Sequence, residues 1–93
     1  RQYIAALIAL GTDGFRLDAA KHMTLDHVNA VFDPALIGGR PVFGEIITGG
    51  GRGNTEYEIF LKPWMAQTPL SAYDFPLFHR MRQAFGFGGD LSI

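Results

Sequence analysis

The sequence has 93 residues, of which 47% are hydrophobic and 12 are glycine, and its formal net charge is -1. This composition is typical of a globular protein and excludes a disordered or collagen-like chain. Eight lysines and arginines are scattered among nine acidic residues. Because they form no positive stripe along which a phosphate backbone could bind, we expect no nucleic-acid partner. The absence of cysteine excludes a disulfide framework and a thiolate metal site.

No apolar run approaches the roughly 20 residues that a membrane-spanning helix needs, so we expect no membrane partner. The sequence starts at Arg1 without the charged, apolar and small-residue pattern of a signal peptide. That abrupt start is typical of a segment of a longer chain. The sequence pattern itself leaves localisation open.

Apolar residues at helical spacing predict a first helix over residues 2–10, which stops at Gly11. Residues 13–18 then alternate with a period of two, which predicts a strand. Residues 23–32 follow with one apolar face and with Thr24 as a plausible N-cap, which predicts a second helix.

The β-rich run 40–47 predicts a second strand, and the glycine-rich letters after it predict a loop. Asn54 or Thr55 is then expected to cap a third helix that runs to about Leu61. Pro63 is expected to disturb this helix.

Residues 70–73 predict a third, short strand, and residues 75–85 predict a final helix opened by Asp74 and Pro76. Strands that alternate with helices at this spacing imply right-handed βαβ crossovers and a parallel sheet. The fold class is therefore α/β, with about three parallel strands alternating with helices and no domain boundary within residues 1–93.

Charged side chains lie where the first two strands are expected to end. In parallel α/β proteins the active site gathers at the C-terminal ends of the strands, which is where Asp18 and Glu45 occur. Arg16 shares the strand parity of Asp18, so both point to one side. Neighbouring strands lie about 4.8 Å apart, so the two carboxylates are expected roughly 5 Å from each other. That separation is the one that retaining glycosidases require.

The two carboxyl groups are expected to differ in acidity. Arg16 precedes Asp18 by two residues on the same face, so it should keep Asp18 ionised as a nucleophile. Glu45 has no basic neighbour in the sequence and is flanked by apolar residues, so we expect it to keep its proton and act as a general acid.

Three stretches resemble one enzyme family. The letters DGFRLDAAKH resemble the fourth-strand signature of the α-amylase family, and VFGEIITGG resembles the fifth-strand signature, which holds the acid/base glutamate. YDFPLFHRM resembles the exit from the sixth strand. The resemblance implies that residues 1–93 are part of a (β/α)₈ TIM barrel and span its fourth to sixth βα units.

Carried over to this sequence, the resemblance implies that Arg16 positions the nucleophile, that Asp18 forms the glycosyl-enzyme intermediate, and that Glu45 acts as acid and then base. Lys21 and His22 match positions that contact sugar on the leaving-group side. In many members the backbone carbonyl at the position of His22 also ligates a structural calcium. A subset of members binds chloride at the position of Arg16.

The resemblance implies a retaining hydrolase that cleaves α-glucosidic bonds, chiefly α-1,4, in α-glucan oligosaccharides or polysaccharides, and it is compatible with secretion. The seventh-strand motif, which supplies the third catalytic carboxylate, is absent, as is the third-strand motif. Glycosyl transfer by the same intermediate is the nearest alternative. A second alternative is a non-catalytic barrel fragment, which would associate with the remainder of the barrel or with itself.

Simpler interpretations stay open for the individual residues. Arg16 and Asp18 could form an ion pair that only fixes the strand, Glu45 could be an exposed carboxylate at a strand end, and Lys21 could be a solvated charge. The run TGGGRGN lacks the GK[ST] ending of a phosphate-binding loop, so we interpret it as a flexible active-site loop.

Aromatic and histidine side chains outside the two motifs are mostly expected to pack. Trp64 and Tyr57 could stack on sugar rings, but their helix should cover the sheet, which favours packing. Tyr73, at a strand end, is a better candidate for stacking. His27 and His79 are expected to be surface or helix-packing residues.

Overall fold

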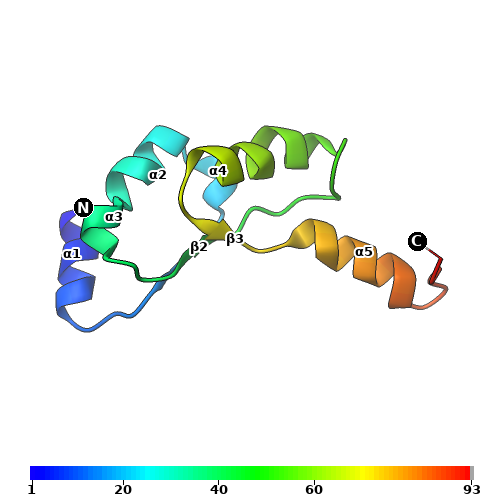
Figure 1. Ribbon diagram of the computed structural model, residues 1–93, viewed down its shortest axis with the longest axis horizontal. Helices are drawn as coiled ribbons and strands as arrows, with labels where there is room; N and C mark the ends of the chain where they lie inside the picture. The colour runs from blue at the N-terminus through cyan, green and yellow to red at the C-terminus, as the bar shows by residue number, and fades with distance from the viewer. Residues whose placement is uncertain (93) are drawn as a thin grey trace.

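The computed structural model describes residues 1–92, which form an elongated molecule with a radius of gyration of 15.8 Å and extents of 49 × 25 × 18 Å. A compact domain of this length would have a radius of gyration of roughly 12 Å. The last helix extends away from the rest of the chain (Figure 1). No helix among the described residues combines the length and the apolar character needed to cross a membrane.

The three predicted strands are confirmed, each shorter than the run that predicted it. They are β1 (Phe15–Leu17), β2 (Val42–Gly44) and β3 (Ser71–Ala72). They form one parallel sheet in the order β1-β2-β3, with Gly44 paired to Leu17 on one side and to Ala72 on the other. Because the strands run in the same direction and in register, the residues that follow them meet at one edge of the sheet.

Two of the predicted helices are confirmed in the first half of the chain. Helix α1 (Gln2–Ala9) is followed by Gly11, whose φ of +101° is readily adopted only by glycine. Helix α2 (Leu25–Val31) begins after Thr24, whose hydroxyl accepts a hydrogen bond from the backbone N–H of His27.

Two short elements were not predicted. A 3₁₀ turn, η1 (Ala20–His22), precedes α2, and the four-residue helix α3 (Pro34–Ile37) follows it. Asp33 caps α3 by accepting the N–H of Ala35 at 3.0 Å. An aspartate followed by a proline is a helix-start signal, but α3 is too short to show a helical period.

The third helix continues past the point where Pro63 was expected to disturb it. A π-helical segment, η2 (Tyr57–Leu61), leads directly into α4 (Lys62–Gln67), and Pro63 lies in the first turn of α4. Proline lacks an N–H, and its ring conflicts with the carbonyl four residues earlier in an α-helix. The wider π turn before Pro63 relieves that conflict, so the helix continues. The predicted cap is confirmed, because the Asn54 side chain accepts the N–H of Tyr57.

The final helix, α5 (Phe75–Phe85), is confirmed with its predicted start, because Asp74 accepts the N–H of Leu77 at 2.9 Å. None of its residues is buried. Four of its large apolar side chains are at least half exposed: Leu77, Phe78, Met81 and Phe85.

The hydrophobic core lies between the sheet and the helices that precede α5. Trp64 of α4 is 1% exposed, and its indole N–H donates to the Ser71 carbonyl at 3.1 Å. A Cβ at Gly44 would lie 2.8 Å from the Trp64 ring, so this strand position requires glycine. The other buried apolar residues are Ile4, Leu17, Ala20, Val28, Phe32, Ile37, Val42, Ile46, Leu61 and Leu70.

Candidate active site

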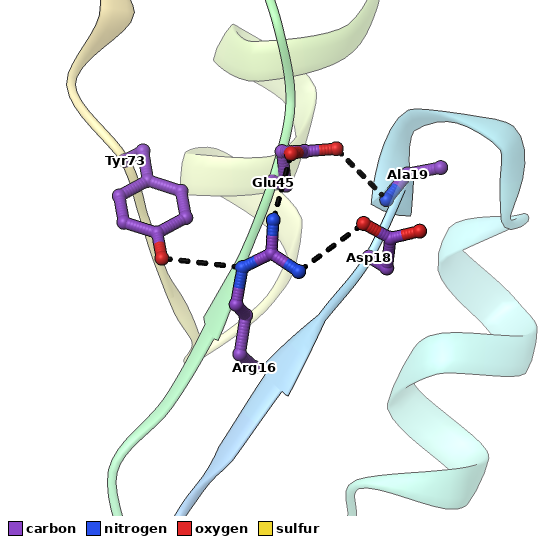
Figure 2. A network of polar contacts seen from close by, with 5 residues as sticks. All are labelled: Arg16, Asp18, Ala19, Glu45 and Tyr73. Carbon is purple, nitrogen blue, oxygen red and sulfur yellow. Dashed lines mark hydrogen bonds and ion pairs between the residues drawn. The ribbon is translucent and has the colours of Figure 1, made fainter.

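One guanidinium joins the side chains that directly follow all three strands (Figure 2). Arg16, the middle residue of β1, donates from Nη1 to Asp18 at 3.1 Å and from Nη2 to Glu45 at 2.7 Å. Its Nε donates to the hydroxyl of Tyr73 at 3.2 Å. The structure therefore brings together the three residues for which the sequence predicted catalytic roles, and it adds Tyr73 to them.

The backbone fixes Glu45 beside the end of β1. The N–H of Glu45 donates to the carbonyl of Leu17 at 2.9 Å, and the Glu45 carbonyl accepts the N–H of Ala20 at 2.9 Å. These bonds extend the pairing of the two strands beyond β2. The Glu45 side chain therefore starts from a backbone position that the strand pairing holds next to Asp18.

A left-handed residue follows Asp18 and turns the chain toward Glu45. Ala19 has a φ of +47°, a conformation that costs an L-residue roughly 1–2 kcal/mol. In this conformation its N–H donates to Oε1 of Glu45 at 3.2 Å, while Arg16 bonds Oε2. Both oxygens of the Glu45 carboxylate therefore have a donor.

The contact between Arg16 and Glu45 corrects one expectation. The sequence places no basic residue next to Glu45, but in the structure Arg16 lies closer to Glu45 than to Asp18. The reason is that the side chain of Arg16 crosses from β1 to β2, which spacing along the sequence does not show. Glu45 therefore has a cationic partner in the folded chain.

The two carboxylates differ in exposure. The Asp18 side chain is 78% exposed and that of Glu45 is 21% exposed. The hydrogen bonds that Arg16 donates, to Tyr73 first and to Asp18 second, raise the pKa of Arg16 above its ordinary value. Arg16 is therefore a permanent cation that holds an exposed and a partly buried carboxylate on one face of the sheet.

A pocket of about 390 Å³ lies beside this group. It is lined by Arg16 and Glu45 together with Tyr73, Asp74, Phe75 and Phe78, while Asp18 is not among its lining residues. A larger pocket, of about 540 Å³, lies between α4 and the start of α5, and neither Asp18 nor Glu45 lines it. We assign the candidate site to the smaller pocket because it contains the paired acid and cation.

Lys21 and His22 follow in η1 and make no direct contact with Arg16 among the described residues. The Lys21 ammonium lies 2.8 Å from the Glu56 carboxylate and 3.4 Å from the Ile47 carbonyl. The His22 side chain is exposed. Both residues follow Asp18 closely in sequence. In the structure, however, they lie outside the network of side chains around Arg16.

Calcium at His22 and chloride at Arg16 stay predictions from the resemblance. Calcium takes six to eight oxygen ligands. Residues 1–92 contain no group of three acidic or histidine side chains that could hold a metal, so calcium at the His22 carbonyl would need other oxygen ligands. Arg16 already donates to Asp18, Glu45 and Tyr73.

Tyr73 is the site residue whose role the sequence did not predict. Its hydroxyl accepts from Arg16, the Arg16 guanidinium lies 5.8 Å from its ring centre, and its ring packs edge-on against Phe43 at 5.1 Å. The available signal was its position directly after β3, which matches those of Asp18 and Glu45. The packing expected for Trp64 and His79 is confirmed, and a His79 ring nitrogen lies 2.7 Å from the Thr48 carbonyl oxygen.

The α-amylase of Aeromonas hydrophila is 51% identical to this chain over 90 residues. The match covers 97% of this chain but 19% of the length of that α-amylase. No family model matches the chain. No solved structure matches it either. The resemblance to α-amylases is confirmed, and the chain is similar to about one fifth of such an enzyme.

Proposed function

We propose, on the premise that the chain corresponds to a segment of an α-amylase, that it supplies two catalytic groups to a longer (β/α)₈ enzyme that cleaves α-glucosidic bonds with retention. The observation that supports this most is the single guanidinium that bonds Asp18 and Glu45 at 3.1 and 2.7 Å. A paired nucleophile and acid on adjacent strands is the arrangement that double displacement requires.

In the first step, Asp18 attacks the anomeric carbon while the bond between that carbon and the leaving oxygen breaks. Glu45 donates its proton to the leaving oxygen. In the second step, Glu45 takes a proton from water, whose oxygen attacks the same carbon and releases the Asp18 carboxylate. Arg16 assists by holding the Asp18 carboxylate in place through its hydrogen bond, before attack and after release.

The proton of Glu45 must face the glycosidic oxygen in the first step, whereas in the structure Oε2 of Glu45 faces Arg16 at 2.7 Å and Oε1 accepts from the N–H of Ala19. We infer that substrate resolves this conflict by taking the position of the Arg16 donor on Glu45, while Arg16 stays on Asp18. Glu45 lines the pocket, so an entering glycosidic oxygen can reach it. Hydrogen bonds of this kind commonly rearrange when the substrate binds.

The pocket also suits a sugar ring. Tyr73, Phe75 and Phe78 give it aromatic walls, against which the apolar faces of glucose units can pack. Lys21 and His22 are proposed to contact glucose units on the leaving-group side. The bond cleaved is proposed to be α-1,4, in starch-like glucans.

The chain needs the rest of a barrel for this activity. Its sheet has three strands, and the helix that follows β3 buries none of its residues. Open sheet edges and an uncovered apolar helix favour association, with the missing barrel units or with further copies of the chain. We expect the purified 93-residue chain to be inactive on starch, and clearing of starch by it would contradict this.

The test is a chimera in which this chain replaces the matching 90 residues of the Aeromonas hydrophila α-amylase. It should release sugars from maltooligosaccharides, and the first product seen by NMR should be the α-anomer. Substitution of Asp18→Asn or Glu45→Gln should lower kcat at least a thousandfold. Oligosaccharides longer than the substrate would instead indicate glycosyl transfer. A fully active D18N or E45Q chimera would refute the proposed roles.

A further inference from the structure

A second group of polar contacts holds the loop that leaves β2. The Lys21 ammonium lies 3.4 Å from the Ile47 carbonyl and 2.8 Å from the Glu56 carboxylate. One carboxylate oxygen of Glu56 also lies close to the loop, 3.6 Å from the position that a Cβ at Gly49 would take. Lys21 thus bonds the loop backbone at the Ile47 carbonyl, and Glu56 holds the ammonium there.

Another side chain bonds the next residue of the loop. A ring nitrogen of His79, on α5, lies 2.7 Å from the Thr48 carbonyl. Thr48 is 1% exposed, and its hydroxyl donates to the carbonyl of Gly50 at 2.9 Å. Two consecutive residues of the loop, Ile47 and Thr48, are therefore bonded at their carbonyls by side chains from η1 and α5.

The pair formed by Lys21 and Glu56 is partly shielded from solvent. The side chain of Lys21 is 21% exposed and that of Glu56 is 37% exposed. The Lys21 ammonium also lies 5.8 Å from the centre of the Phe60 ring. The hydrogen bond from Lys21 is the largest cause that lowers the pKa of Glu56 below its ordinary value. Glu56 is therefore ionised and paired at neutral pH.

The pair formed by Lys21 and Glu56 lies between the segment that follows Asp18 and the segment that follows Glu45. Lys21 lies three residues after Asp18, and Ile47 lies two residues after Glu45. A bond from Lys21 to the Ile47 carbonyl therefore fixes the chain leaving β1 against the chain leaving β2. Glu56, at the start of the next helix, keeps the ammonium in place for that bond.

We propose that Glu56 is a positioning residue that locks the loop after Glu45 onto the turn after Asp18 and thereby sets the position of Lys21 in the sugar cleft. The loop locking rests only on the contacts above. The effect on Lys21 as a sugar contact rests on the proposed function. Glu56 itself touches neither of the catalytic carboxylates in the described structure.

Limited proteolysis of the chimera tests the loop locking without any need for activity. Arg52 is an exposed trypsin site within the glycine-rich part of the loop. Glu56→Gln and Lys21→Met should each speed cleavage after Arg52 about fivefold, which corresponds to the loss of one favourable ion pair. The double variant should be cleaved no faster than the faster single variant, because the two residues act as one unit.

Lys62→Met is the matched control, because it removes the ion pair between Lys62 and Glu58 from the same helical segment. The side chain of Lys62 is 64% exposed and that of Glu58 is 37% exposed. The Lys62→Met variant should leave cleavage after Arg52 unchanged. Hydrogen exchange of the peptide that contains Gly49 is the second measurement and should be faster only in the Lys21 and Glu56 variants. Cleavage and exchange at the parent rate in both of these variants would overturn the proposal.

Kinetics separate positioning from general destabilisation. Glu56→Gln should lower kcat/KM about fivefold for maltoheptaose, which places glucose units on the leaving-group side. It should leave kcat/KM for 4-nitrophenyl α-maltotrioside nearly unchanged, because the nitrophenyl group that leaves is not a sugar. Equal losses on both substrates would contradict the role in positioning Lys21. If the unsubstituted chimera is inactive, the proposed function fails, whereas the proteolysis result still decides the loop locking.

Discussion

The guanidinium of Arg16 lies 2.7 Å from the carboxylate of Glu45, although the two residues are 29 positions apart and on different strands. The same guanidinium bonds Asp18 at 3.1 Å. One cation therefore couples the proposed nucleophile to the proposed acid. A change in the position of the Arg16 guanidinium should therefore alter its contacts with both carboxylates.

Arg16→Lys is expected to lower kcat of the chimera about a hundredfold, with a smaller change in KM. A lysine keeps the positive charge but lacks the planar fork that reaches both carboxylates, and a misplacement of about 1 Å can cost about that much. Steady-state kinetics on maltooligosaccharides measure the effect. Arg80→Lys, at an exposed position of α5, is the matched control and should keep full activity. An R16K chimera as active as that control would show that the fork is dispensable.

Tyr73→Phe is expected to lower kcat/KM about fivefold, which is the effect of losing one ordinary hydrogen bond. The variant removes the hydroxyl that accepts from Arg16 at 3.2 Å but keeps the ring that packs against Phe43. The midpoint temperature of thermal unfolding should change little, because the ring of Tyr73 remains. A kcat/KM unchanged from the parent would mean that Asp18 and Glu45 alone hold Arg16 in place.

Gly44→Ala is expected to destabilise the fold by about 1–3 kcal/mol, the usual cost of an added methyl group in a full core. The new Cβ would lie 2.8 Å from the Trp64 ring and 3.0 Å from Ala20. The free energy of unfolding of the chimera measures the effect. Gly51→Ala is the control, because its Cβ would have its nearest contact at an ordinary 3.5 Å from Pro76. Equal stabilities of the two variants would refute the close packing at Gly44.

The ion pair between Glu56 and Lys21 predicts a pH dependence. Because the hydrogen bond from Lys21 lowers the pKa of Glu56 from its ordinary value of 4.5, folding favours the carboxylate. The stabilisation is present above pH 4.5 and is lost as the pH falls through the lower pKa of the folded state. The stability gap between the parent and E56Q chimeras should therefore close as the pH falls from about 4.5 through the lowered pKa of Glu56. A gap that is constant over that range would contradict the pairing.

Local rules predicted most of the elements. The caps Thr24 and Asp74 and the period-two runs gave the right helix starts and strands, because those signals depend only on neighbouring residues. The continuation of the third helix past Pro63 could not be predicted in this way. The helix continues through a π turn, and Trp64 packs against Gly44. Both features depend on tertiary packing.

The sequence likewise predicted a part of the candidate site, but not all of its contacts. Strand parity correctly placed Arg16 and Asp18 on one side, and the parallel sheet placed Glu45 beside them. Strand parity could not show which carboxylate Arg16 approaches more closely, because that depends on the gap between β1 and β2. It also could not show that Tyr73 reaches Arg16 from the third strand, since no local pattern encodes a contact over 57 residues.

The central claim is that the carboxylate of Asp18 forms a covalent bond to the sugar. The most direct test is to treat the chimera with a 5-fluoro α-glucosyl fluoride, which is attacked with loss of fluoride and leaves a slowly hydrolysed glycosyl-enzyme. Mass spectrometry of the digested protein should find the added sugar on the peptide that contains Asp18, and the label should be absent from the D18N chimera. A sugar bound to any other residue, or an active chimera that never becomes labelled, would contradict the account.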